Sequence, residues 1–281
     1  MSDRNDLISV DQLKQKIGNE NLVILDGTWH MPNANRNAVE EYNSDHIEGA
    51  LHFDINAVAD QNSGQPHTMP NADLFETSVR AMGVTNQSEI VIYDVAGMFA
   101  AARVWWMFKS FGAKNVKLLD GGLPAWKAAG NETTDMKTNT IVGDFVAKFE
   151  KGSVTSLADM REQVASGSHQ VLDARGAGRF AGSDPEPRAG MRAGHMPGAT
   201  NVPFPSLLNE DGTFRSNEEL STLFSSKLSA EGKDITASCG SGVTAAIILF
   251  SLNLIGITNT SLYDGSWSEW GSLQDTPIVT D

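Results

Sequence analysis

The feature that most constrains the fold is a duplication: one order of strand and helix patterns occurs twice, about 145 residues apart. Each copy opens with a short apolar run that ends in an aspartate, at Leu22–Asp26 and at Gln170–Asp173. Each copy then carries a His-x-x-Gly-Ala stretch, at His46–Ala50 and at His195–Ala199. A period of this length is too long for a solenoid and indicates two copies of one domain.

Strand patterns alternate with helix patterns in both copies. Glu89–Asp94 in the first half corresponds to Asp234–Ser238 in the second, and both are short apolar runs typical of buried strands. Helices are expected over residues 71–82, 99–111 and 217–226. This alternation predicts an α/β fold, with a mostly parallel sheet flanked by helices in each half. We predict domains over 1–140 and 154–281, joined by a polar, glycine-containing linker over 141–153.

The single cysteine lies where such a fold places its ligands. In parallel α/β sheets ligands bind at the carboxyl ends of strands, and Asp94 and Cys239 follow equivalent strands. After Cys239 comes a glycine-containing turn and then a helix, so its thiol should face free N–H groups and the positive end of the helix dipole. Such a position favours a reactive, exposed thiolate. We therefore predict a nucleophile at Cys239, in a pocket to which the first domain contributes a wall.

The sequence argues against three other roles for the cysteine. A free cysteine is most often a small buried hydrophobe, although a glycine-flanked turn between strand and helix argues against that here. Cysteine-dependent phosphatases carry an arginine six positions after the cysteine, where this chain has Ala245. A papain-like protease would need its family motif around the cysteine, and that motif is missing.

The composition of the chain excludes several classes of partner and site. The net charge is −14, which argues against nucleic acid and anionic membranes because both need a basic surface. One cysteine excludes an intramolecular disulfide and a thiolate zinc site, and it suits a reducing compartment. The first residues lack the apolar core of a signal peptide, so a cytoplasmic location is expected. No dinucleotide, phosphate-loop or metal-ligand pattern occurs, so neither a cofactor nor a metal is predicted.

The segment Cys-Gly-Ser-Gly-Val-Thr at 239–244 resembles the active-site loop of 3-mercaptopyruvate sulfurtransferases, in the rhodanese superfamily. The resemblance extends over nearly the whole chain and includes the Asp-Gly-Gly turn before Trp126, Gly178–Phe180 and Pro185–Arg188. It implies two rhodanese-like domains, an inactive first and a catalytic second. It also implies that Cys239 takes sulfur from 3-mercaptopyruvate as a persulfide, releases pyruvate, and passes the sulfur to a thiol, to cyanide or to a thioredoxin-like protein.

Further site residues follow from the same resemblance. Arg179 and Arg188 match the family's substrate-binding arginines, and both are expected in a segment without helical or strand periodicity. Ser241 and His67 match two members of a proposed proton relay. The acidic member falls on Asn56, which can hold an imidazole by a hydrogen bond but cannot stabilise an imidazolium by charge. The remaining loop residues are expected to bind through their backbone N–H groups: Gly240, Gly242, Val243 and Thr244.

The loop also bears on the sulfur donor. The sister family of thiosulfate sulfurtransferases usually carries Arg and Lys directly after the cysteine, where this chain has Gly240 and Ser241. The pocket therefore suits a monoanionic carboxylate thiol better than dianionic thiosulfate. Two alternatives stay open at this point: a thiosulfate:cyanide sulfurtransferase on the same fold, and a non-catalytic protein that carries a persulfide to a partner.

Overall fold

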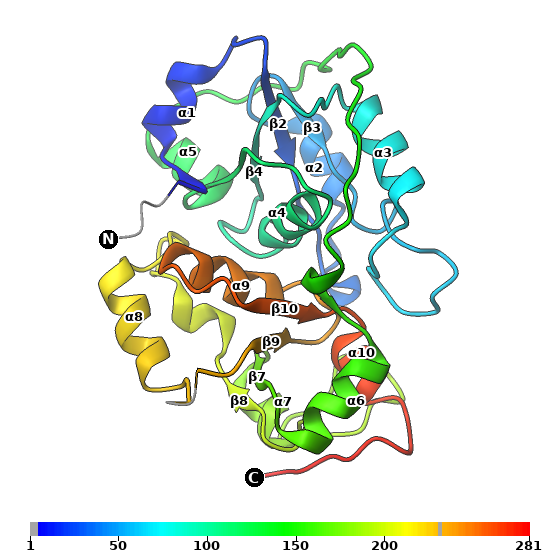
Figure 1. Cartoon of the computed structure of the whole chain (residues 1–281). Coiled ribbons are helices and arrows are strands. Elements are labelled where there is room, and N and C mark those ends of the chain that lie inside the picture. The colour runs from blue at the N-terminus through cyan, green and yellow to red at the C-terminus, as the bar shows by residue number, and fades with distance from the viewer. Residues whose placement is uncertain (1–4, 230–231) are drawn as a thin grey trace.

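The computed structural model describes residues 5–229 and 232–281, which form two α/β domains in tandem (Figure 1). The first sheet has the strand order β1-β5-β4-β2-β3 and the second has β6-β10-β9-β7-β8. These orders are equivalent, and every strand pair in both sheets is parallel. The duplication and the α/β fold predicted from the sequence are therefore confirmed.

The strands of the first sheet are β1 (Leu7–Ile8), β2 (Leu22–Asp26), β3 (Ala50–His52), β4 (Glu89–Tyr93) and β5 (Val116–Leu119). Those of the second are β6 (Val154–Thr155), β7 (Gln170–Asp173), β8 (Thr200–Asn201), β9 (Ile235–Ser238) and β10 (Thr260–Tyr263). The first domain has helices α1 (Val10–Lys16), α2 (Ala38–Ser44), α3 (Ala72–Ala81), α4 (Ala101–Ser110) and α5 (Gly122–Ala128). The second has α6 (Leu157–Ser166), α7 (Ala177–Ala181), α8 (Asn217–Ser225), α9 (Ala245–Leu254) and α10 (Ser266–Trp270).

Equivalent helices begin in the same way because the duplicated sequence keeps their caps. Ser9 caps α1 and forms a capping box with Gln12. Ser156 caps α6 and forms the same reciprocal pair of hydrogen bonds with Asp159. Each box satisfies N–H groups that the first turn of a helix leaves without a partner.

The two domains meet through α4 and α9, which lie between the two sheets (Figure 1). Both helices are buried on nearly all sides. This burial is expected for α9, which has no charged residue, whereas α4 carries Arg103 and Lys109. Trp105 of α4 packs edge-on against Phe250 of α9, with 4.8 Å between the ring centroids. Because α4 follows the loop after β4 and α9 follows the loop after β9, both loops lie at the domain interface.

The expected linker over 141–153 runs along the first domain. The Phe145 N–H donates to the Val84 carbonyl at 3.1 Å, and the Lys148 N–H donates to the Phe111 carbonyl at 3.0 Å. The Phe145 side chain is fully buried. The second domain begins soon afterwards, at β6.

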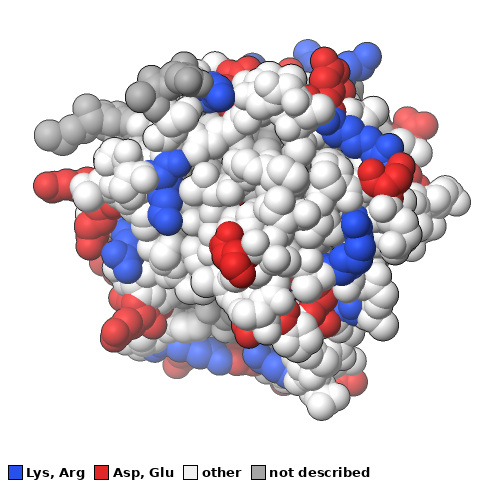
Figure 2. Space-filling view, turned by 90° about the horizontal axis from the view of Figure 1, so that it is seen from below, with Lys and Arg blue, Asp and Glu red and all other residues white. Residues whose placement is uncertain are grey.

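The surface shows mixed charge on the face seen from below the view of Figure 1. There, basic and acidic side chains are interspersed around a largely uncharged centre (Figure 2). The described residues on that face thus offer no continuous basic track for a phosphate backbone. Within residues 5–229 and 232–281, no helix has the length and apolar character that crossing a bilayer requires.

Candidate active site

A cavity of about 190 Å³ lies between the domains and contains the cysteine. The second domain contributes Ala174, Arg175, Gly176, Arg179, Arg188, Phe204, Cys239, Gly240, Ser241, Val243 and Thr244 to its lining. The first domain contributes Trp29, Met31 and Phe99. The prediction that the first domain forms a wall of the pocket is confirmed. The lining combines apolar walls with a small number of charged groups, which is typical of small-molecule sites.

Cys239 follows β9 directly, and five loop residues separate it from the start of α9. The sequence predicts an exposed thiol, and that prediction is wrong, because only 1% of the Cys239 surface is accessible to solvent. Cys239 nevertheless lines the cavity, together with three residues of the first domain, Trp29, Met31 and Phe99. A sulfur species formed here is therefore shielded from bulk water.

The backbone of the cysteine loop has its carbonyl groups turned away from the cavity. The Cys239 carbonyl accepts from the Trp267 N–H at 3.0 Å, and the Gly240 carbonyl accepts from the Ser268 N–H at 2.8 Å. In a planar trans peptide the next N–H points in the opposite direction to the carbonyl. The N–H groups of Gly240 and Ser241 therefore point back towards the loop interior.

A third carbonyl of the loop, that of Gly242, is held by Arg103 of the first domain. Gly242 adopts a left-handed backbone with φ of 74°, which glycine accommodates without strain. Among the described residues, the N–H groups of residues 240–245 have no hydrogen-bond acceptor within the protein. Such a ring of inward-pointing N–H groups forms an anion-binding nest.

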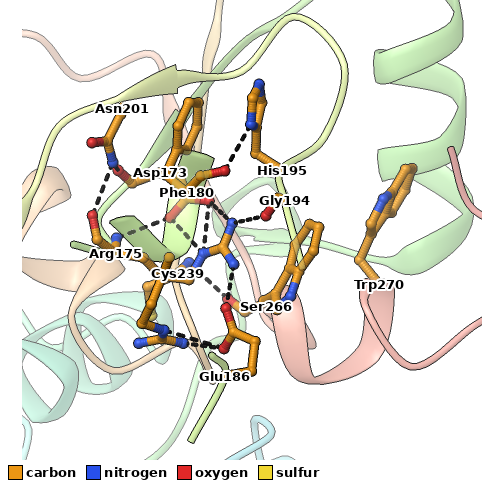
Figure 3. Close-up of polar contacts among 12 residues, drawn as sticks. Asp173, Arg175, Phe180, Glu186, Gly194, His195, Asn201, Cys239, Ser266 and Trp270 are labelled. Atoms are coloured by element: carbon orange, nitrogen blue, oxygen red, sulfur yellow. Dashed lines mark hydrogen bonds and ion pairs between the residues drawn. The ribbon is translucent and has the colours of Figure 1, made fainter. Parts of the chain in front are cut away.

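Arg179 lies on the short helix α7, within the segment whose sequence shows no helical or strand periodicity. A helix of five residues makes too few turns to show a periodic pattern in sequence. Its Nη2 donates to Glu186 Oε2 at 2.5 Å. Glu186 also accepts from Arg175, whose guanidinium pairs in turn with Asp173 (Figure 3). Arg179 is thus held rigidly, and part of its charge is already balanced.

Arg188 differs from Arg179 in its pairing. No carboxylate lies within 4.0 Å of the Arg188 guanidinium in the part of the chain that the structure describes. Burial lowers the pKa of Arg188, while the nearby Cys239 acts to raise it. Its Nη2 donates to Ser241 Oγ over a long 3.4 Å. Arg188 is therefore the cation best placed to receive an anionic ligand in the cavity.

His67 is buried beside the site but does not line the cavity. Its backbone is left-handed, with φ of 61°, and its ring packs edge-on against Trp29 with 4.6 Å between centroids. Neither ring nitrogen has a hydrogen-bond partner among the described residues. Burial, followed by the charges of Arg103 and Arg188, lowers the pKa of His67 to about 3. The imidazole is therefore neutral at physiological pH.

The residue at the acidic position of the expected relay forms no hydrogen bond with that ring. Asn56 is exposed, and its backbone N–H donates to Asp54 Oδ1 at 2.8 Å. Since both ring nitrogens of His67 lack a partner, neither Asn56 nor Asp54 holds the imidazole. The structure thus brings together Cys239, Ser241 and the two arginines, but it forms no hydrogen-bonded chain from Ser241 through His67 to an acid.

Both halves of the chain match the family described as the rhodanese-like domain, over residues 9–129 and 156–273. The chain belongs to the rhodanese-like family. It is 39% identical to the human 3-mercaptopyruvate sulfurtransferase, over 89% of this chain and 84% of that one. It is 38% identical to the chicken thiosulfate sulfurtransferase, over 89% of this chain and 86% of that one.

Among solved structures, this rhodanese-like chain is similar to SseA from Escherichia coli, described as a 3-mercaptopyruvate sulfotransferase. The TM-score is 0.85 at 35% identity, covering 94% of this chain and all of the other. The curated relatives are enzymes that transfer sulfur, and the chain is a sulfurtransferase of that kind. The family and reaction class predicted from the sequence are confirmed.

Two residues near the cysteine loop were missed by the sequence analysis. Arg103 of α4 is fully buried and forms an ion pair with Asp264, at 2.8 Å between Nη2 and Oδ1. The available signal was local: Arg103 is the one charged side chain in the apolar run from Phe99 to Phe108. A charge in such a run must have a buried partner.

Proposed function

We propose that this rhodanese-like protein moves a sulfur atom from 3-mercaptopyruvate, through a persulfide on Cys239, to a thiol acceptor. The observation that supports this most is the content of one cavity. Its lining brings together the only thiol of the chain, a nest of N–H groups without an acceptor among the described residues, and the side chains of Arg179 and Arg188. The nest suits an anionic sulfur, and the arginines suit the carboxylate of the donor.

The choice of donor is supported by the packing of Arg179 against Gly240. A Cβ atom placed on Gly240 would lie 3.2 Å from Arg179 Nη2 and 3.8 Å from Arg188 Nη1. A basic side chain at position 240 would therefore crowd and repel the arginines, whereas glycine leaves them free to hold a carboxylate. Identity alone does not decide, because relatives named for either donor are equally similar.

The first half-reaction forms the persulfide. The Cys239 thiolate attacks the sulfur of 3-mercaptopyruvate, an S–S bond forms, and the C–S bond breaks. The electron pair of that bond passes to carbon as the enolate of pyruvate, which takes the proton released by the donor thiol. The loop N–H groups stabilise the anionic terminal sulfur, and no cofactor is needed.

Ser241 and His67 are proposed as catalytic residues beside Cys239. The Ser241 hydroxyl lies in the cavity lining and accepts from Arg188, so its own proton can be directed at the donor carbonyl. His67 is neutral, and its low pKa makes it a weak base, so we propose that it acts by hydrogen bonding and without an acidic partner. Gly240, Gly242, Val243 and Thr244 are proposed to act through their backbone.

The second half-reaction transfers the outer sulfur to an acceptor. The nucleophile is proposed to be cyanide or a thiol, either of a small molecule or of a thioredoxin-like protein.

We also propose a cytoplasmic location, because a single reactive cysteine suits a reducing compartment. Fractionation of cells that produce the chain tests the location.

The function is tested by intact-mass analysis and by steady-state kinetics with each donor. We expect 3-mercaptopyruvate to add one sulfur atom to the protein, and kcat/KM to be higher for this donor than for thiosulfate. Arg188→Met should raise KM for 3-mercaptopyruvate by about 10- to 100-fold because a charge-assisted carboxylate contact is lost. Arg161→Met is the matched control, since that arginine forms an exposed ion pair with Asp275 outside the cavity.

Two outcomes would overturn the proposal in favour of its alternatives. A clear preference for thiosulfate would identify a thiosulfate:cyanide sulfurtransferase. Persulfide formation without turnover, in the presence of a small thiol, would identify a carrier rather than an enzyme for this donor. Turnover by Cys239→Ser would exclude the persulfide mechanism itself.

A further inference from the structure

Arg103 occupies an unusual place, because it belongs to the first domain but holds the backbone of the second. Its Nη1 donates to the Gly242 carbonyl at 3.3 Å, and its Nη2 donates to the His67 carbonyl. Its Cζ lies 4.4 Å from the centre of the Trp106 ring, which stabilises the cation further. The side chain is completely buried, so these contacts are fixed by packing on all sides.

Asp264 completes the arrangement. It forms an ion pair with Arg103 and accepts from the Met69 N–H at 2.6 Å. The Arg103–Asp264 pair therefore holds the chain on both sides of residue 68 in the first domain. At the same time, it holds the cysteine loop of the second domain at Gly242. One buried ion pair thus joins the two segments that carry His67 and Cys239.

The duplication provides an internal reference for this contact. Across the interface, the Phe214 N–H of the second domain donates to Asp120 Oδ1 of the first at 2.8 Å. Asp120 follows β5 as Asp264 follows β10, and Phe214 corresponds to Met69. The two domain-to-domain hydrogen bonds are therefore equivalent in the two copies. Position 248 of the second copy, which corresponds to Arg103, is Ile248.

We propose that Arg103, balanced by Asp264, is a positioning residue for sulfur transfer: it turns the Gly242 carbonyl outward so that the Val243 N–H points into the anion nest. The start of α10 orients two carbonyls of the loop, at Cys239 and Gly240. The third oriented carbonyl, at Gly242, depends on the first domain. A Cβ atom on Gly242 would lie 2.9 Å from Arg103 Nη1, so the loop and the guanidinium are in direct contact.

The proposal gives the first domain, which has no cysteine, a part in catalysis by the second. Nest geometry matters because preorganised N–H donors stabilise developing negative charge, and misplacing them by about 1 Å can cost about 100-fold in rate. The donor itself is held by Arg179 and Arg188, which Arg103 does not touch. Loss of Arg103 should therefore lower kcat and leave KM for the donor nearly unchanged.

The experiment compares Arg103→Met, Arg103→Lys, Asp264→Asn and the matched control Asp120→Asn. Single-turnover release of pyruvate is normalised to the thiol that iodoacetamide titrates, since Cys239 is the only cysteine. We expect a loss of about 100-fold in the rate for Arg103→Met, and of about tenfold for Arg103→Lys, which keeps one cationic donor. Asp264→Asn should lose about tenfold and Asp120→Asn less than twofold, all with KM within threefold.

If the Arg103–Asp264 pair only holds the two domains together and does not position the loop, a different pattern is expected. All four variants would then unfold at lower temperature while keeping the wild-type rate per titrated thiol, and that result would overturn the proposal. Equal rate losses in Asp264→Asn and Asp120→Asn would also overturn it. If Arg103→Met does not fold, Arg103→Lys and the two aspartate variants decide by the same criteria.

The inference rests on the proposed function only in that Cys239 takes up sulfur. Wild-type persulfide formation is therefore measured first with both donors. If only thiosulfate loads the cysteine, the proposed donor fails, and the same variants are compared with thiosulfate by the mass gained in a single turnover.

Discussion

The loops that follow β4 and β9 occupy equivalent positions in the two domains, but they differ in whether their N–H groups already bind an anion. In the first domain, the Asp94 carboxylate accepts from the N–H groups of Ala96, Phe99, Ala100 and Ala101 at 2.8–2.9 Å. In the second, the equivalent position is Cys239, and the N–H groups after it have no acceptor among the described residues. The first nest contains its own anion, whereas the second is left open for one that arrives with the substrate.

The strand-end aspartates of the two domains show a second contrast. Asp173 accepts from the backbone N–H of Arg175 and also pairs with its guanidinium. Asp26 accepts from the N–H and hydroxyl of Thr28, which occupies the place of that arginine. The first domain therefore keeps the turn but lacks the cation. These contrasts separate what both domains share, a fixed turn after the strand, from what catalysis needs, an open nest beside arginines.

The largest expected effect comes from giving the second loop the anion of the first. Cys239→Asp should lose more than 1000-fold in sulfur transfer, as should Cys239→Ser, because the nucleophile is absent. Cys239→Asp should nevertheless be about 1–2 kcal/mol more stable than Cys239→Ser, because a carboxylate accepts from the free N–H groups. Urea unfolding measures the difference. A less stable aspartate variant would show that the two nests are not equivalent.

The next effect concerns the cation that only the second domain has. Asp173→Asn should destabilise the protein by about 3–5 kcal/mol, because it removes the main charge partner of the buried Arg175. Arg175 would retain Glu186, which also holds Arg179, so donor affinity should fall as well. Thermal unfolding and KM for the donor test both parts. Unchanged stability would mean that Glu186 alone balances Arg175.

Removing the internal anion of the first loop should affect stability more than activity. Asp94→Ala leaves four N–H groups without their acceptor and should cost about 2–3 kcal/mol. Asp94→Asn keeps one acceptor oxygen and should cost less. At temperatures where both variants are folded, kcat should stay within about threefold of wild type. A larger loss of kcat in either variant would give the first loop a part in the chemistry.

Much of this arrangement could be predicted from the sequence because it depends on local, duplicated patterns. The repeated strands, the N-cap at Ser9 and the loop around Cys239 are contiguous segments whose spacing is visible in one chain. Contacts between distant residues have no such signal. The pairing of Arg103 with Asp264 joins residues that are 161 positions apart, and the cavity at Cys239 is lined in part by residues of the other domain.

The same limit explains why single site residues were harder to place than motifs. The sequence shows an arginine at 179 but not that Glu186 already holds it. It shows a histidine at 67 but not that its ring is buried without a hydrogen-bond partner. Both features depend on how loops pack in three dimensions. The spacing of residues along the chain does not show which side chains surround a loop residue.

The smallest expected effect is a pH dependence of stability at Asp26. This aspartate has Thr28 where Asp173 of the second domain has the cation Arg175. Burial raises the pKa of Asp26 from 3.8 to about 6, with Asp94 adding to the rise. A carboxyl group whose pKa is higher in the folded state favours folding when protonated, so its contribution is lost as pH rises from about 4 to about 6. Asp26→Asn removes this dependence. Relative to wild type, the variant should gain about 1–2 kcal/mol between pH 4.5 and pH 8. Urea unfolding at both pH values measures the gain, and an equal difference at the two would show that Asp26 does not titrate in this range.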